Sequence, residues 1–325
     1  MKAIVTGGAG FIGSHIVDLL LKENIDVTVL GNFSTGRPEN LDHVRGQIKL
    51  VECDLSVKGS WIQHFDNADW VFHLAALADI VPSIQQPEAY FRANVDGTFN
   101  VLQAAKAAEV KRFIYIASSS CYGIPDKYPT PENAEIRPQY PYALAKRIGE
   151  ELVMHWAQVY KFPALSLRFF NVYGPRSRTS GTYGAVVGVF LGQKLAGKPF
   201  TVVGNGEQTR DFTYVTDIVQ AIVTAAKSDR TGQIYNVGSG VTVSVNRLVE
   251  LLGGDKVLIP KRPGEPDSTF ADISKIRTEL RWEPQVSIEE GIAEILKHID
   301  YWRDAPVWTP DSIAYATKDW IRYLG

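Results

Sequence analysis

The sequence predicts an α/β protein with a doubly wound parallel sheet and a smaller C-terminal α/β domain. In the first half of the chain, short apolar runs alternate with amphipathic segments. A glycine-rich turn joins the first apolar run to the first amphipathic segment, and beyond Asn171 the pattern loosens into long polar loops. Strands that alternate with helices indicate parallel βαβ units.

The apolar runs are short enough to be buried strands, and the predicted strands are residues 3–7, 26–30, 48–54, 69–76, 112–120 and 164–170. Between them, amphipathic segments predict helices at residues 14–23, 95–110 and 141–160. The last of these has Pro141 in its first turn, where a missing N–H costs little.

Two domains follow from this pattern. Residues 1–170 form the first, and about 211–238 return to it because "TGQIYNVGS" again resembles a strand. The second domain contains residues from about 171 to 210 and from 239 to 325.

Composition limits the class of function. The chain has 325 residues, of which 45% are hydrophobic, and a formal charge of −2. This balance favours neither nucleic acid nor a membrane surface as a partner. No apolar run approaches the roughly 20 residues that span a bilayer. Cys53 and Cys121 have no metal-like spacing, so we expect no metal site, no disulfide and a cytoplasmic location.

The turn "TGGAGFIG" predicts a dinucleotide site. Gly7, Gly10 and Gly13 follow a strand and open a helix, which lets the backbone approach a pyrophosphate at the helix N-terminus. An acidic residue usually follows the second strand and binds the adenosine ribose, but Gly31 stands there.

At that strand end, Asn32 and Ser34 can still form hydrogen bonds with the ribose, and Arg37 could instead face a 2′-phosphate. We therefore predict NAD, with NADP left open. Asp54 is placed to accept a hydrogen bond from the adenine amino group, or to cap a turn.

"PYALAKRIGEE" raises the possibility of acid/base chemistry. Tyr142 and Lys146 are four residues apart and share a helix face. An ammonium beside a phenol lowers the phenol pKa, and a cationic nicotinamide would lower it further. Ser118 follows a parallel strand, at the sheet edge where ligands bind. These residues predict a catalytic group.

The chain resembles the extended short-chain dehydrogenase/reductases, in the branch typified by UDP-glucose 4-epimerase, which have a Rossmann fold. The matching segments occur in family order: "TGGAGFIGSHIV", "CDL", "VFHLAA", "ANVDGT", "SSSCYG", "PYALAKRIGE", "LRFFNVYGP", "GNGEQTRDFTYVTDI" and "RPGEPDSTFADISK".

The resemblance implies roles for individual residues. Tyr142 is the acid/base, Lys146 binds the nicotinamide ribose, Ser118 shares the reacting proton and Asn94 holds the catalytic geometry. The other implied cofactor contacts are Phe11, Ile12, Leu55, Leu74, Ala75, Ala76 and Phe169. The implied substrate contacts are Ser118, Ser120, Asn171, Arg210, Arg262, Glu265 and Thr269, with the arginines on the diphosphate and Glu265 on a ribose.

The implied reaction is epimerisation of a nucleotide-diphosphate sugar at C4, through a 4-keto sugar, by a homodimer. In relatives with dehydratase or decarboxylase activity, carboxylates stand where this chain has Ser119 and Ser120. Uronate 4-epimerase, 3,5-epimerase or ketoreductase activity, and a non-catalytic dinucleotide sensor, stay open as alternatives.

Two expectations concern the C-terminal region. Thr269 is small, and by resemblance a small residue there leaves room for an N-acetyl group, so UDP-N-acetylhexosamines are expected substrates beside UDP-hexoses. The aromatic residues of the tail, 301–325, are expected to pack on the second domain or on a subunit and not to bind ligand.

Overall fold

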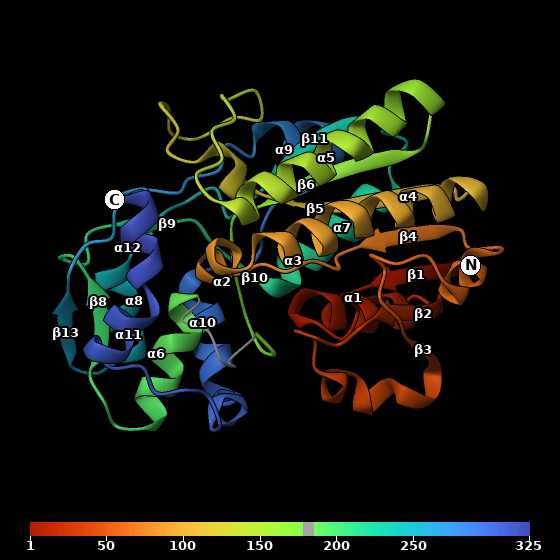
Figure 1. Ribbon diagram of the computed structural model, residues 1–325. Coiled ribbons are helices and arrows are strands. Elements are labelled where there is room, and N and C mark those ends of the chain that lie inside the picture. Colours follow the sequence, from red (N-terminus) through yellow and green to blue (C-terminus); the bar gives the residue numbers. More distant parts are fainter. Residues whose placement is uncertain (178–184) are drawn as a thin grey trace.

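The computed structural model describes residues 1–177 and 185–325. Its centre is a seven-stranded parallel sheet in the order β11-β6-β5-β4-β1-β2-β3, which confirms the predicted fold class (Figure 1). The strands are β1 (Lys2–Thr6), β2 (Asp26–Gly31), β3 (Ile48–Glu52), β4 (Trp70–His73), β5 (Arg112–Ser118), β6 (Ala164–Phe169) and β11 (Gln233–Val237). The last of these is the predicted return of the chain to the sheet.

Helices cover both faces of the sheet, and each face has its own apolar core. On one face, α1 (Phe11–Lys22) and α7 (Val215–Lys227) pack together over the strands. On the other face lie α3 (Pro87–Phe91), α4 (Gly97–Ala107) and α5 (Pro141–Tyr160) (Figure 1). Because both faces are covered, the central strands are buried throughout, as parallel sheets require.

The strand order contains a topological switch point between β1 and β4. The chain runs outward from β1 through β2 to β3, and then crosses back to place β4 on the other side of β1. Ligands bind at such points, outside the carboxyl ends of the strands. The loops after β1 and β4 therefore open onto the expected site.

Short helices complete this half of the molecule. They are η1 (Pro38–Gln47), η2 (Ser60–Phe65), α2 (Ile80–Gln85), the π-helical turn η3 (Arg92–Asp96) and η4 (Ser119–Tyr122). The π-helical turn carries Asn94, and turns of this kind occur frequently at functional sites.

A smaller group of elements packs beside the carboxyl ends of the sheet around a third core. Strands β8 (Phe200–Val203) and β13 (Lys256–Ile259) pair in parallel, and helices surround them. The helices are α6 (Val186–Leu195), α8 (Val245–Leu252), α10 (Ile288–Lys297) and η5 (Ile299–Trp302). The pairs β7 (Asn171–Tyr173) with β10 (Phe212–Tyr214), and β9 (Thr209–Arg210) with β12 (Val243–Ser244), connect this group to the sheet half.

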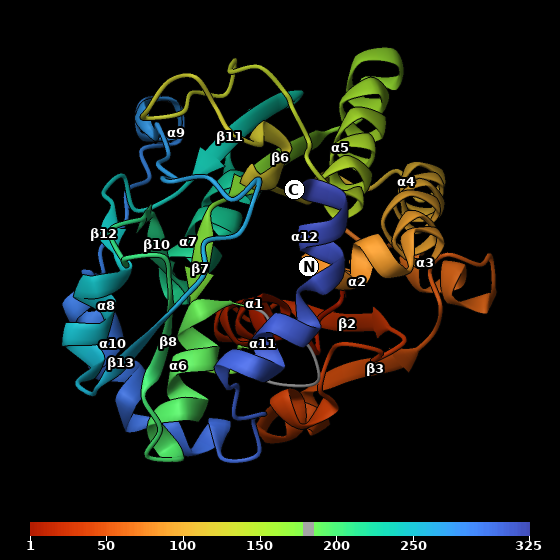
Figure 2. The same cartoon turned by 60° about the vertical axis from the view of Figure 1, so that its left-hand side comes forward.

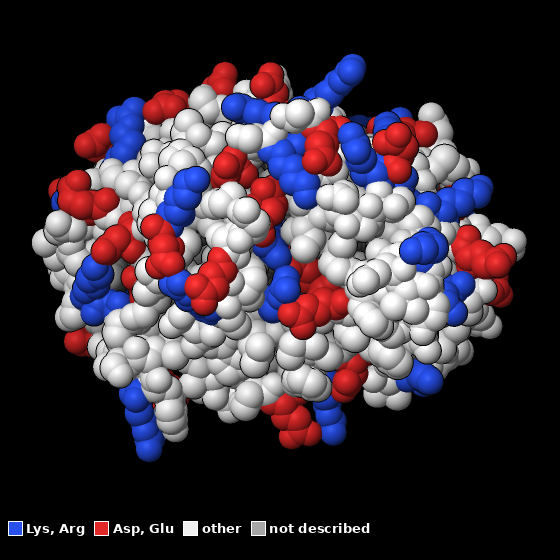
Figure 3. All heavy atoms as spheres, turned by 90° about the horizontal axis from the view of Figure 1, so that it is seen from above, with Lys and Arg blue, Asp and Glu red and all other residues white. Residues whose placement is uncertain are grey.

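The remaining helices are α9 (Ser274–Leu280), which contacts β11, and the C-terminal pair α11 (Pro310–Ala316) and α12 (Lys318–Leu324). Figure 2 shows α12 in front of the sheet half, close to α2. Within the described residues, no helix is both long and apolar enough to cross a membrane. On the face shown in Figure 3, basic and acidic side chains are interspersed.

Candidate active site

The glycine loop after β1 forms the floor of a cavity of about 700 Å³. Gly7 has a φ of +69°, and a Cβ there would lie 2.8 Å from the backbone nitrogen of Ala75. A Cβ on Gly13 would collide with the carbonyl oxygen of Gly7. The loop can therefore pass this close to the β4 end only with glycine at these positions, and it leaves its backbone open to a ligand.

The cavity is lined by most of the residues that the sequence predicts for the site. On the cofactor side these are Gly7, Gly10, Phe11, Ile12, Gly13, Asn32, Ser34, Asp54, Leu55, Leu74, Ala75, Ala76 and Phe169. On the substrate side they are Ser118, Ser120, Tyr142, Asn171, Arg210, Arg262, Glu265 and Thr269. One cavity thus joins both predicted subsites, and its volume suits small-molecule ligands.

The end of β2 bears on the choice between NAD and NADP. Arg37 is not on the cavity wall, because its guanidinium lies over the Tyr301 ring, 5.0 Å from the centroid. Asp54 does line the cavity, and its carboxylate accepts hydrogen bonds from the backbone and side chain of Ser56, so it also has the turn-capping role. A Cβ on Gly31 would have no contact closer than 3.8 Å, so the backbone here does not itself exclude a side chain.

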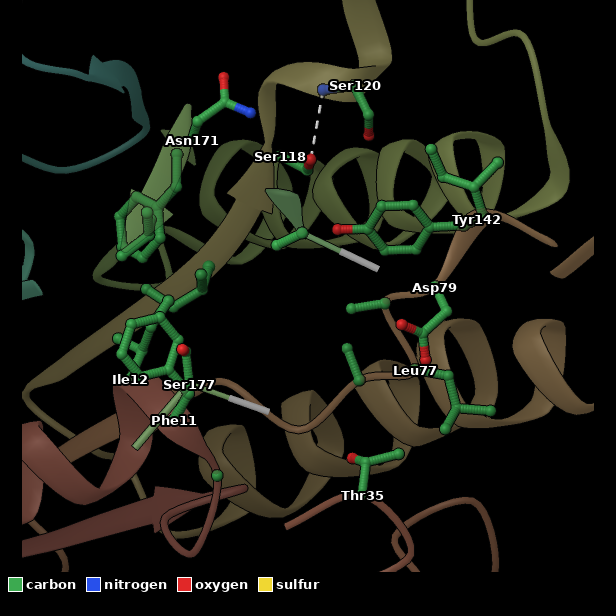
Figure 4. A pocket seen from close by; sticks show the side chains of 18 of the residues that line it. Phe11, Ile12, Thr35, Leu77, Asp79, Ser118, Ser120, Tyr142, Asn171 and Ser177 are labelled. Carbon is green, nitrogen blue, oxygen red and sulfur yellow. Dashed lines mark hydrogen bonds between the residues drawn. The ribbon is translucent and has the colours of Figure 1, made fainter. Parts of the chain in front are cut away.

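Tyr142 and Ser118 meet on the cavity wall. In Figure 4 the Tyr142 hydroxyl points into the cavity towards Ser118, whose Oγ accepts a hydrogen bond from the Ser120 backbone at 3.2 Å. Tyr142 comes from the first turn of α5 and Ser118 from the end of β5, so both belong to rigid elements. Such a pair can exchange a proton with a hydroxyl held in the cavity.

The ionisation of Tyr142 differs from the expectation. Burial raises the pKa of Tyr142; a hydrogen bond with Ser118 opposes that shift and the nearby Asp79 adds to it. Burial also lowers the pKa of Lys146 to about 7, which the Glu150 carboxylate partly offsets. In the ligand-free chain the net shift of the Tyr142 pKa is therefore upward, opposite to the expected lowering, because desolvation penalises both charged forms.

Lys146 and Asn94 lie behind the cavity wall. The Lys146 ammonium sits over the Tyr115 ring, 4.3 Å from its centroid, and the residue is buried. The Asn94 side chain accepts a hydrogen bond from the Leu77 backbone at 2.8 Å and donates one to its carbonyl at 2.9 Å. Asn94 thus fixes the loop after β4, which is a structural way of holding the geometry.

A buried ion cluster anchors α5. The Glu150 carboxylate accepts hydrogen bonds from Arg168 at 2.7 Å, from Arg147 at 2.6 Å and from Ser166 at 2.8 Å. Burial would raise the Glu150 pKa, but the hydrogen bonds and charge of Arg168 bring it below its usual value. Glu150 lies one turn beyond Lys146, so the cluster attaches the middle of this helix to β6.

At the far end of the cavity, the two predicted phosphate-binding arginines share one carboxylate. Glu265 pairs with Arg210 at 2.9 Å and with Arg262 at 3.0 Å. The group carries a net positive charge in a half-buried setting, which suits a diphosphate. Next to it, the Thr269 hydroxyl donates to the Asn171 side chain at 2.6 Å and accepts from the Asp211 backbone at 3.3 Å.

The cavity wall also includes residues that the sequence did not indicate, among them Asp79, Tyr140 and Trp320. Asp79 follows the β4 loop at the carboxyl edge of the sheet, which is the position that could have identified it. Trp320 belongs to the tail. Of the tail aromatics expected to pack on the second domain, Trp302 is fully buried in the third core, whereas Trp320 is buried on the cavity wall.

Comparison with known proteins identifies the family. A model of the NAD dependent epimerase/dehydratase family matches residues 3–238. The chain belongs to this family. It therefore belongs with enzymes that modify nucleotide-diphosphate sugars and bind NAD.

Three similar proteins have different epimerase activities. A UDP-glucose 4-epimerase of Mycolicibacterium smegmatis is 35% identical over 318 residues, which cover 94% of this chain and 99% of that protein. The UDP-N-acetylglucosamine 4-epimerase from Methanobrevibacter ruminantium M1, solved with UDP-N-acetylmuramic acid, has a TM-score of 0.87 at 34% identity, covering 91% and 97%. The UDP-glucuronic acid 4-epimerase from Bacillus cereus, solved with UDP-glucuronic acid and NAD, has a TM-score of 0.84 at 31% identity, covering 94% and 99%.

Proposed function

We propose that this chain epimerises a UDP-hexose or a UDP-N-acetylhexosamine at C4 with tightly bound NAD. The observation that carries the proposal is the position of Tyr142 and Ser118, which face one cavity between the glycine loop and the arginine pair. A sugar whose diphosphate rests on Arg210 and Arg262 would present its ring to the Tyr142 phenol. The two domains expected from the sequence are then a cofactor side and a substrate side.

The residues present fit the cofactor. The close packing of the glycine loop excludes side chains at Gly7 and Gly13, and the loop lines the cavity with backbone at the N-terminus of α1, which suits a pyrophosphate. Bound NAD supplies a reversible hydride acceptor for the sugar carbon, and its cationic ring favours the Tyr142 phenolate. Lys146 would then lie behind Tyr142 and act on the nicotinamide ribose.

The protein residues carry the proton and hold the substrate. Tyr142 takes the proton of the sugar 4-hydroxyl and later returns it, while Ser118 shares a hydrogen bond with the same oxygen. Arg210 and Arg262 keep the diphosphate in place while the 4-keto sugar turns over. Because Thr269 is small and its hydroxyl faces Asn171, the proposal includes an N-acetyl substituent in the sugar pocket.

We further propose a cytoplasmic homodimer. Both cysteines are free thiols, which suits a reducing compartment. Phe99 of α4 packs edge-on against Trp156 of α5, which in turn contacts Tyr160. Phe99 and Tyr160 are exposed, so these two helices present an aromatic face that a second subunit would cover. Size-exclusion chromatography with light scattering tests this: Phe99→Glu should give monomers, and a wild-type monomer would contradict it.

The test of function is incubation of the purified protein with UDP-glucose, UDP-galactose and their N-acetylated counterparts, without added cofactor, followed by NMR of the products. An epimerase equilibrates the C4 epimers, whereas a dinucleotide sensor leaves them unchanged. Tyr142→Phe should retain NAD and fold but lose turnover by roughly 10²–10⁴-fold, the usual contribution of a general acid/base. A Tyr142→Phe variant with wild-type turnover would overturn the assignment.

A further inference from the structure

The C-terminal helix α12 forms part of the cavity wall. Trp320 on this helix lines the cavity and is only 6% exposed. The matching family model ends at residue 238, so α12 lies outside the segment that defines the family. The position of Trp320 therefore lies outside what the family match describes.

Contacts with both halves of the molecule fix α12 in place. The Trp320 indole N–H donates to the Pro263 carbonyl at 2.7 Å, and the Arg262 guanidinium lies over the indole, 5.1 Å from its centroid. On the other side, the Asp319 carboxylate accepts a hydrogen bond from Gln85 of α2 at 2.7 Å. Figures 1 and 2 both show α12 beside α2. Trp320 is thus held between the sheet half and the loop that carries Arg262 and Pro263.

Three aromatic side chains lead from Arg262 to the proposed acid/base. The Trp320 ring lies 6.4 Å from the Tyr140 ring, which in turn stacks on Tyr142 at 6.3 Å with an interplanar angle of 9°. Trp320 and Tyr140 both line the cavity. When the diphosphate lies on Arg262 and the reacting hydroxyl at Tyr142, the sugar ring lies between them. The row of Trp320, Tyr140 and Tyr142 therefore borders the sugar.

We propose that Trp320 is a substrate-binding residue that packs against the apolar C–H face of the hexose. The inference rests on the proposed function and adds to it a sugar contact contributed by the C-terminal tail. An aromatic ring supplies a large contact area at low conformational cost, and the Pro263 hydrogen bond and the Arg262 contact hold this ring in a fixed orientation. In this proposal the diphosphate and the uracil contact other residues. Trp320 therefore contributes to the affinity for a UDP-sugar and not to the affinity for UDP.

Calorimetric titration of the NAD-saturated protein with UDP, UDP-glucose and UDP-N-acetylglucosamine tests this inference. We expect Trp320→Ala to weaken the binding of both UDP-sugars by roughly 10- to 100-fold, as for a buried tryptophan at a binding surface. The affinity for UDP should stay within about threefold of wild type, well under the tenfold change that 1.4 kcal/mol produces. NAD content, measured on the denatured protein, should not change.

Tyr323→Ala is the matched control, because Tyr323 lies on the same helix, is 61% exposed and does not line the cavity. It should bind all three ligands as wild type does. If Trp320→Ala does not fold, the pair Trp320→Phe and Trp320→Leu decides: phenylalanine should retain most of the sugar affinity and leucine should lose it. Equal affinities in those two variants would overturn the proposal.

Three other outcomes of the titration would each contradict the proposal. Equal losses for UDP and UDP-sugars would show that Trp320 acts only by positioning Arg262, which overturns the sugar contact. Wild-type affinities in Trp320→Ala would overturn it as well, and both results would leave the proposed function intact. Wild-type protein that holds NAD but binds none of the three ligands would contradict the proposed function and this inference together.

Discussion

The buried ion cluster that anchors α5 predicts a large loss of stability for Glu150→Gln. The Glu150 side chain is 1% exposed and that of Arg168 is 2% exposed, so the substitution leaves a buried guanidinium without its counter-ion. Removing one partner of a buried pair costs about 3–5 kcal/mol. Glutamine keeps the shape of the side chain, but one oxygen that accepted hydrogen bonds becomes an amide donor facing other donors. We therefore expect an unfolding free energy lower by about 3–5 kcal/mol.

The measurement is denaturant unfolding of the NAD-free protein at pH 7, with Glu151→Gln as the control. Glu151 is the next residue, but its side chain is 60% exposed and its pair with Arg147 is a surface contact. That variant should lie within about 0.5 kcal/mol of wild type. Adding Arg168→Met to Glu150→Gln should restore part of the loss, because it removes the buried guanidinium that has lost its counter-ion.

The pH dependence has a defined sign. The folded pKa of Glu150 is lower than its unfolded value of about 4.3, so its contribution is fully present above that value and is lost as the pH falls through the folded pKa. The difference between wild type and Glu150→Gln should therefore begin to shrink below the unfolded value of about 4.3 and should be lost only below the folded pKa. Equal unfolding free energies for Glu150→Gln and Glu151→Gln at pH 7 would refute the reasoning.

Three further predictions concern the cavity. Gly31→Asp, whose Cβ would meet no atom closer than 3.8 Å, should raise the preference for NAD over NADP at least about tenfold in binding titrations, because the carboxylate repels a 2′-phosphate; an unchanged ratio would contradict this. Asp79→Asn removes a charge that raises the Tyr142 pKa, so the rise of kcat/KM with pH should move to lower pH, and a shift to higher pH would exclude Tyr142 as the base. Thr269→Tyr should lower turnover of the N-acetylated sugar by roughly 10- to 100-fold and spare the plain hexose. Thr269→Val, which removes the hydroxyl hydrogen bonds at constant size, separates their loss from the effect of bulk.

The sequence was most informative where the site is local in the chain. Gly7, Gly10 and Gly13 lie in one loop, and Tyr142 and Lys146 share one helix, so their spacing was enough to predict that they lie close together. Trp320 could not be placed in this way. It meets Pro263 across 57 positions, and its neighbour Asp319 meets Gln85 across 234, and no periodic pattern predicts contacts at such separations.

Electrostatics was the other part that the sequence could not supply. The spacing of Tyr142 and Lys146 indicated a phenol beside an ammonium, but their burial decides the direction of both pKa shifts. The pairing of Arg210 and Arg262 through Glu265 is a further example, because each residue was expected to contact the ligand separately. Solvent exposure and side-chain geometry are properties of the folded chain.

The place of β11 in the sheet has a consequence for synthesis of the protein on the ribosome. Residues 233–237 complete the sheet beside β6, although β6 ends at Phe169. While the intervening residues are being translated, β6 is an open edge strand, and its residues are all buried in the finished protein. Such an edge is a template for pairing with other chains. In the interval between translation of the two strands, the nascent chain therefore exposes an edge at which it can pair with other chains.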